Sequence, residues 1–167
     1  MSTGIKKDYA ERKDKDAYKT IHEIGRKYGY PFEKHIYITA DNYINSVFRI
    51  SGPKGTNPIE NARVKAKKPV LLYQHGLLDS GAGICLDGAD SMAFFFADLG
   101  FDVWLNNSRG NRFSRDHKFL NPKSDDEYWN FSFHELGVYD QPAVFNYIFN
   151  ETGCSNLTYI GHSQGTS

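Results

Sequence analysis

The pentapeptide GHSQG at residues 161–165 carries the clearest chemistry in the sequence. It fits the pattern G-x-S-x-G, in which a serine stands on a tight turn between a strand and a helix. Such a turn strains the backbone of the serine, and its neighbours must be small because other parts of the chain pass close to them. A serine hydroxyl exposed in this way can attack an ester carbonyl when a base activates it. The sequence therefore predicts Ser163 as a nucleophile, with Gly161, His162 and Gly165 shaping its turn.

A second motif, HGLL at residues 75–78, suits the binding of an oxyanion. Its glycine lets the chain turn, and the N–H of Leu77 can then point at a developing negative charge. The other donor is expected to be the N–H of Gln164, because that residue directly follows the nucleophile. Each such donor contributes about 2.7–4 kcal/mol to transition-state stabilisation. We therefore expect His75 and Gly76 to support the site, although a histidine at a strand end can also have only a structural role.

The polar turn NNSRG at residues 106–110 allows two interpretations. It can line the rim of a site, because ligands bind beyond the carboxyl ends of parallel strands. It can also be a structural turn in which Arg109 pairs with a carboxylate, and we favour this second interpretation. Asp140 precedes Ser163 and lies in a helical pattern, so we interpret it as structural and not as a catalytic acid.

Alternating and continuous apolar runs predict the strands that position these motifs. Residues 33–50 alternate as a β-hairpin with a turn at Asp41-Asn42. Continuous apolar runs are typical of strands covered on both faces. Three such strands are predicted, at residues 70–73, 101–105 and 157–160.

Helices are predicted between these strands. Residues 21–28 have helical spacing, and residues 91–99 form an apolar helix whose phenylalanines at 94–96 are expected in the core. A longer helix begins at a capping box on Ser132 and should be interrupted at Pro142. Strands that alternate with helices predict an α/β fold with a parallel sheet and right-handed crossovers.

Composition excludes several classes of partner. The chain has 167 residues with 20 basic and 20 acidic side chains, so no basic excess points to nucleic acid. No apolar run is long enough for a transmembrane segment, and the polar first twenty residues lack the core of a secretory signal. The two cysteines, Cys85 and Cys154, form neither a disulfide framework nor a metal motif. We expect no metal and no organic cofactor.

Four blocks of the sequence resemble the acid lipase family, which contains the gastric and lysosomal acid lipases and related sterol esterases. These blocks are HGLLDS at 75–80, SMAFFFADLGFDVWLNNSRGN at 91–111, YWNFSFHELGVYDQPA at 128–143 and GHSQGTS at 161–167. Residues 28–50 are similar to the N-terminal lipase-associated region of that family.

The resemblance implies a carboxylic ester hydrolase with an α/β-hydrolase fold that acts on long-chain acyl glycerides or sterol esters. It matches Ser163 to the nucleophile, and Leu77 and Gln164 to the oxyanion-hole amides. It also implies three segments: a polar charged tail at 1–21, a lipase-associated region at 22–90, and the first part of the hydrolase core at 91–167. Members of the family are typically secreted or lysosomal, which contrasts with the polar start of this chain.

The sequence departs from the family after its nucleophile. In α/β-hydrolases an acidic residue and then a histidine follow the serine. Only four residues follow Ser163, none of them acidic or histidine, and all six histidines precede it. We therefore expect a fragment with a truncated α/β-hydrolase fold that ends at the nucleophile turn and has no triad-dependent turnover of its own.

Two other functions stay open at this point. The strand before Ser163 should be an apolar sheet edge, so a catalytically inactive protein could bind a partner through this edge. A different hydrolase built on the same turn, such as a peptidase or a thioesterase, is also compatible with the pattern.

Overall fold

A computed structural model describes residues 19–58 and 68–167 of the chain, so most of the predicted tail lies outside the described residues. Five strands form a sheet in the order β1-β2-β4-β3-β6, and the short β5 pairs with the N-terminal end of β2. The strands are β1 (Phe32–Ile38), β2 (Tyr43–Ile50), β3 (Val70–Gln74), β4 (Asp102–Asn106), β5 (Asp116–His117) and β6 (Thr158–Gly161). The predicted α/β fold is confirmed.

The predicted hairpin and the predicted parallel strands belong to one mixed sheet. β1 and β2 form an antiparallel hairpin whose turn contains Asn42 with φ of 76°, a left-handed angle that asparagine tolerates well. β2 runs antiparallel to β4, whereas β3 runs parallel to both β4 and β6. β6 lies at an edge of this sheet, and its residues are exposed or only partly buried.

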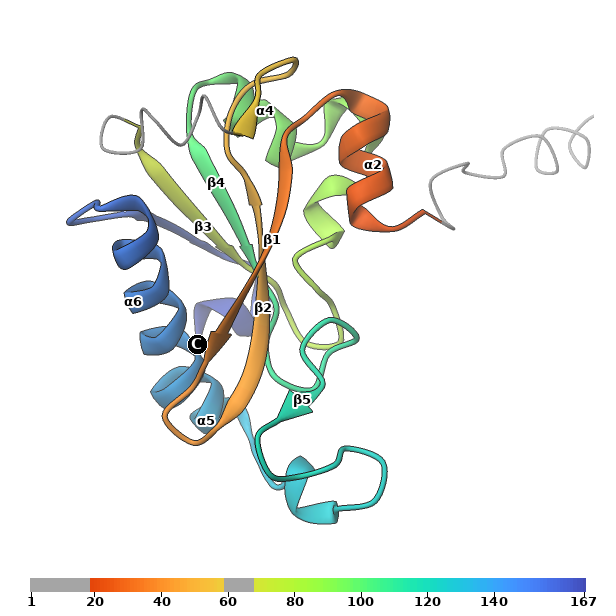
Figure 1. Cartoon of the computed structure of the whole chain (residues 1–167), viewed down its shortest axis with the longest axis vertical. Coiled ribbons are helices and arrows are strands. Elements are labelled where there is room, and N and C mark those ends of the chain that lie inside the picture. Colours follow the sequence, from red (N-terminus) through yellow and green to blue (C-terminus); the bar gives the residue numbers. More distant parts are fainter. Residues whose placement is uncertain (1–18, 59–67) are drawn as a thin grey trace, which may run out of the picture.

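Side chains alternate across the sheet and form two hydrophobic cores. Leu71 and Val103 pack on the face covered by α2 (Ile21–Tyr28) and α4 (Met92–Asp98). Leu72 and Trp104 pack on the opposite face, against α6 (Gln141–Thr152). Figure 1 shows α6 on one side of the sheet and α2 and α4 on the other. β3 and β4 therefore read as continuous apolar runs because both of their faces are buried. β6 was predicted in the same way, but as an edge strand it is exposed or only partly buried.

The apolar helix α4 is only half buried, which corrects the prediction for its phenylalanine run. Phe94 is fully buried, but Phe95 is 58% exposed. Successive helical residues are rotated by about 100° around the axis, so three consecutive side chains cannot all face one core. Gly100, with φ of 90°, ends the helix as predicted.

The predicted long helix is divided into three parts. The capping box on Ser132 opens a short α5 (Phe133–Glu135), a π-helical turn follows at Leu136–Asp140, and α6 continues the helix. Pro142 lies in the first turn of α6, where its missing N–H costs least. The interruption expected at Pro142 is therefore a widened turn just before it, and this turn contains the buried Asp140.

Short 3-10 turns complete the described structure, at Gly83–Cys85, Gly88–Asp90, Asp126–Trp129 and Ser163–Thr166. Within residues 19–58 and 68–167, no helix combines the length and the apolar character that crossing a bilayer requires.

Candidate active site

Ser163 occupies a strained turn directly after β6. Its φ is 53°, in the left-handed region that side-chain-bearing residues rarely adopt. A Cβ added at Gly165 would lie 2.5 Å from the carbonyl oxygen of Gln74, and one added at Gly161 would collide with the carbonyl oxygen of Gly165. The expected strain and the expected need for small neighbours are both present at this turn.

The HGLL motif lies against this turn. A Cβ built on Gly76 would be 3.0 Å from Cβ of Ser163 and 3.2 Å from Nδ1 of the exposed His162. Leu78 has φ of 60° and is 97% exposed. Of the described non-glycine residues with positive φ, only Asn42 lies away from these two motifs. Backbone strain is thus concentrated where the two motifs meet, and its occurrence at Leu78 has no signal in the sequence.

Two backbone N–H groups at this junction have no acceptor. Among the described residues, nothing accepts a hydrogen bond from the N–H of Leu77 or from that of Gln164. Most backbone N–H groups in folded proteins are paired within the protein or with water. These two donors are therefore available to an external oxygen atom, and both residues line the same cleft.

The ring of His75 is fully engaged by the chain around it. It is 5% exposed, its Nδ1 lies 2.7 Å from the carbonyl oxygen of Gly76, and its Nε2 accepts from the N–H of Ser108 at 3.1 Å. Burial lowers the pKa of His75, although its bond to Gly76 and the nearby Asp79 oppose this effect. A neutral ring with its proton on Nδ1 satisfies both bonds. The ring of His75 therefore braces the loop that lies beside Ser163.

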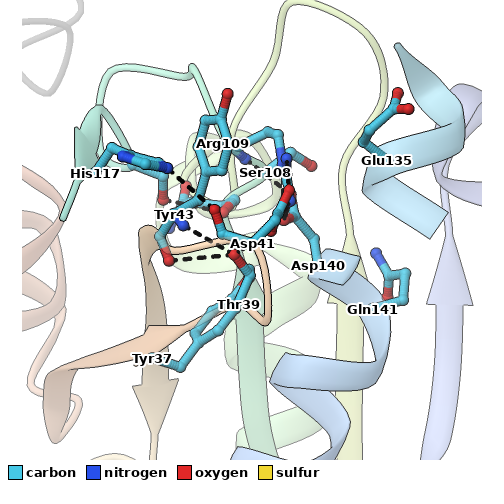
Figure 2. A network of polar contacts seen from close by, with 12 residues as sticks. Tyr37, Thr39, Asp41, Tyr43, Ser108, Arg109, His117, Glu135, Asp140 and Gln141 are labelled. Carbon is cyan, nitrogen blue, oxygen red and sulfur yellow. Dashed lines mark hydrogen bonds and ion pairs between the residues drawn. The ribbon is translucent and has the colours of Figure 1, made fainter. Parts of the chain in front are cut away.

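Arg109 is paired with carboxylates, as its structural interpretation predicts. Its Nε and NH2 groups lie 2.9 and 2.8 Å from Oδ1 of Asp140, and its NH1 lies 2.6 Å from Oδ2 of Asp41 (Figure 2). The guanidinium also stacks 3.9 Å from the ring centre of Tyr43. Arg109 and Ser108 in addition line the cleft, so the alternative interpretation of this turn as part of the rim also holds.

A cleft of about 910 Å³ opens beside these motifs. Its polar wall includes His75, Ser108, Asn111 and Gln164. Much of its remaining surface is apolar and comes from Ile21, Ile24, Leu77, Leu86, Trp129, Phe131, Phe133 and Leu136. A volume of this size lies within the range of small-molecule binding sites.

No base contacts the nucleophile candidate in the described part of the chain. There the Ser163 hydroxyl forms no hydrogen bond, and its carbonyl oxygen accepts from Thr166 at 2.7 Å. In the same residues no group of three or more His, Cys, Asp or Glu side chains is arranged to hold a metal ion.

Comparison with known proteins places these motifs in a family. Residues 21–87 match the partial α/β-hydrolase lipase region, and residues 69–167 match the α/β-hydrolase fold. The chain is 46% identical to mouse lipase member K over 153 residues, which is 91% of this chain and 37% of that protein. It is 44% identical to human lysosomal acid lipase/cholesteryl ester hydrolase over 155 residues, 92% of this chain and 37% of that protein.

Bovine gastric triacylglycerol lipase is 43% identical over 156 residues, 93% of this chain and 38% of that protein. The chain thus spans little more than a third of the length of these relatives. An esterase of Pyrococcus furiosus has a similar fold, with a TM-score of 0.56 at 13% identity over 84% of this chain and 45% of that one. With the matching motifs, the two family regions and the identity to curated lipases, this chain belongs to the acid lipase family of α/β hydrolases.

Proposed function

We propose that this chain provides the nucleophile and the oxyanion hole for hydrolysis of carboxylic esters of lipids. The observation that carries the proposal is the position of two unpaired N–H groups, on Leu77 and Gln164, beside the strained Ser163. Donors fixed in place before the reaction stabilise developing charge without reorganisation.

In the proposed mechanism a base removes the proton of the Ser163 hydroxyl as its oxygen attacks the ester carbonyl carbon. The carbonyl oxygen becomes an oxyanion, which accepts hydrogen bonds from the N–H groups of Leu77 and Gln164. The intermediate collapses by breaking the bond to the alcohol, which leaves with the proton returned by the base. Water then attacks the acyl-serine in the same manner and releases the acid.

The cleft supports a lipid ester as the substrate. Its apolar side chains, among them Phe131, Phe133 and Leu136, can bury an acyl chain. Burial of each CH₂ group contributes about 0.8 kcal/mol. The names of the matched relatives, triacylglycerol lipase and cholesteryl ester hydrolase, are consistent with glycerides or sterol esters.

Turnover in this proposal needs a base, and within residues 19–58 and 68–167 no side chain forms a hydrogen bond with the Ser163 hydroxyl. His75 also has both ring nitrogens occupied, by the carbonyl oxygen of Gly76 and the N–H of Ser108. We therefore propose that the 167-residue chain alone has no triad-dependent turnover.

Hydrolysis of p-nitrophenyl esters tests both parts of the proposal. In the protein isolated from its own cells, we expect Ser163→Ala to reduce kcat by about 10⁶-fold, the scale seen when a serine nucleophile is removed. Ser167→Ala is the matched control, since Ser167 is an exposed serine four residues away. Activity that survives Ser163→Ala contradicts the assignment of the nucleophile. Ser163-dependent turnover by the purified 167-residue chain contradicts the requirement for an additional base.

A second candidate function rests on the exposed edge of β6. In the described structure β6 pairs only with β3, so its other edge has unpaired backbone groups that can bind another strand. We propose this alternative as a catalytically inactive protein that associates with a partner. It predicts a stable oligomer or complex that Ser163→Ala leaves intact, and a monodisperse monomer in size-exclusion chromatography would contradict it.

A further inference from the structure

The peptide group between Gly76 and Leu77 links the ring of His75 to the proposed oxyanion hole. This group contains both the carbonyl oxygen of Gly76 and the N–H of Leu77. Because a trans peptide is planar, its C=O and N–H bonds point in nearly opposite directions. The Gly76 oxygen accepts from Nδ1 of His75 at 2.7 Å and, at 3.4 Å, from the N–H of Asp79, so the shorter bond from His75 is the main constraint on the direction of the Leu77 N–H.

The other ring nitrogen is fixed by the turn that follows β4. Nε2 of His75 accepts from the N–H of Ser108 at 3.1 Å, and Nδ2 of Asn111 lies 3.3 Å from it. An acceptor at Nε2 requires the proton to be on Nδ1, which is the nitrogen that faces Gly76. The turn thus determines both the place of the ring and its tautomer.

Arg109 anchors this turn to two other elements. Its N–H donates to Oδ2 of Asp140 at 3.0 Å, and its side chain pairs with Asp140 of the π-helical turn and with Asp41 of the hairpin turn. The Arg109 side chain is 1% exposed, and that of Asp140 is fully buried. Figure 2 shows the guanidinium held between the two carboxylates. Such bidentate, buried contacts leave the residues next to Arg109 little freedom to move.

We propose that His75 and Arg109 are positioning residues for the Leu77 N–H: Arg109 holds Ser108, Ser108 holds the ring of His75, and that ring orients the Gly76–Leu77 peptide. This inference rests on the proposed function only for its effect on turnover. The order of the Leu77 peptide is a property of the chain itself and can be measured without any substrate.

The test measures the ¹⁵N order parameter of the Leu77 N–H by NMR in the 167-residue chain. In the unsubstituted chain we expect about 0.85, the value of rigid backbone, and a histidine ring spectrum with the proton on Nδ1. His75→Ala and Arg109→Lys should both lower the order parameter to below about 0.6. Lysine keeps the positive charge but loses the bidentate geometry, so it separates geometry from charge. His134→Ala, which removes an exposed ring outside the cleft, is the control.

His75→Asn keeps the argument testable if His75→Ala does not fold. An asparagine amide can still donate to the Gly76 oxygen but cannot reach the N–H of Ser108, so we expect an intermediate order parameter. An order parameter for Leu77 that is unchanged in folded His75→Asn and Arg109→Lys would falsify the proposal. Finding the proton on Nε2 of His75 would overturn it as well.

Turnover by the native protein gives a second readout. We expect His75→Asn to lower kcat about 10- to 100-fold while KM changes less than about threefold, since a misplaced donor acts on the transition state. An equal fold-change in kcat and in KM, or no change in either, contradicts the positioning role. If the unsubstituted protein shows no turnover that depends on Ser163, the proposed function fails, and the order parameters still decide the positioning role.

Discussion

Two buried arginines form ion pairs near opposite ends of β4 and have different surroundings. Arg49 pairs with Asp102, the first residue of β4, through Nε and NH2 at 2.7 and 2.6 Å. Its guanidinium also lies 4.9 Å from the ring centre of Trp104, a residue of β4. Arg109 lies three residues beyond the end of β4 and joins a hairpin turn and a helical turn to a loop that lines the cleft.

The comparison separates stability from site geometry. Both arginines are buried and pair with carboxylates, so removing one carboxylate leaves a buried charge less well compensated. Only Arg109 is connected, through Ser108 and His75, to the peptide of Leu77. Similar ion pairs therefore have different consequences according to the end of the parallel strands at which they lie.

Asp102→Asn should cause the largest loss of stability. Arg49 would keep Glu33, at 3.6 Å, and the weaker attraction of Glu151, so we expect the free energy of unfolding to fall by about 3–5 kcal/mol. Urea unfolding followed by circular dichroism measures this loss. The comparison further predicts an unchanged order parameter for the Leu77 N–H in the folded variant, and a mobile Leu77 would show that the two ends of β4 are not independent.

Asp140→Asn should cost less stability but disturb the site. Asp41 still pairs with Arg109, so we expect a loss of about 2–3 kcal/mol by the same measurement. The N–H of Arg109 would also lose a charged acceptor, and the order parameter of Leu77 should fall. A rigid Leu77 in this variant would mean that the cluster around Arg109 contributes only stability.

Asp41→Asn should have a smaller effect than either. The side chain of Asp41 is 25% exposed, so water compensates part of the lost interaction, and we expect about 1 kcal/mol. Burial alone would raise the pKa of Asp41, but hydrogen bonds from Arg109 and Thr39 lower it overall. This contribution to stability is therefore present above about pH 4 and is lost as the pH falls through the lowered pKa. A loss equal to that of Asp140→Asn would show that exposure does not distinguish the two carboxylates.

The smallest predicted effect is a pH dependence from His75. Burial lowers its pKa in the folded chain, so just below about pH 6.5 the unfolded chain binds a proton that the folded chain does not. The free energy of unfolding should therefore decrease as the pH falls from about 6.5 toward the lowered pKa. His75→Asn should flatten this slope in urea titrations.

His22 needs a separate control in that titration. Burial and the nearby Lys34 and Arg26 lower its pKa too, so it contributes a slope of the same sign. His22→Asn should leave the His75 part of the slope in place. If His22→Asn removes the whole slope, His75 is not the neutral, buried ring inferred here.

Local patterns predicted most of the fold. The apolar runs of β3 and β4, the alternation of the hairpin and the capping box on Ser132 each depend on residues close together in the chain, so the sequence contains the whole signal. The Ser163 turn was predictable for the same reason. The division into segments at residues 22 and 91 stays a prediction. One sheet contains strands from both of these predicted segments, so the sheet does not mark the boundary at residue 91.

Contacts between distant residues were not predictable in this way. The sequence predicts a carboxylate for Arg109 but does not identify Asp41, which is 68 positions away and has no pattern in common with it. The bonds of the His75 ring depend likewise on where the turn after β4 folds back. Phe95 was assigned wrongly because an apolar run does not reveal which side of a short helix faces solvent.

The pairing of β6 with β3 sets the order in which the chain can assemble. Residue 71 pairs with residue 158, whereas the hairpin strands β1 and β2 are neighbours in the sequence. Closing so long a loop has a large entropic cost, and contacts between distant residues slow folding. We therefore expect the hairpin to form early and the Ser163 turn to be completed late. The loop that carries Leu77 can then be in place before the serine arrives beside it, so the proposed catalytic groups come together only in the last stage of folding.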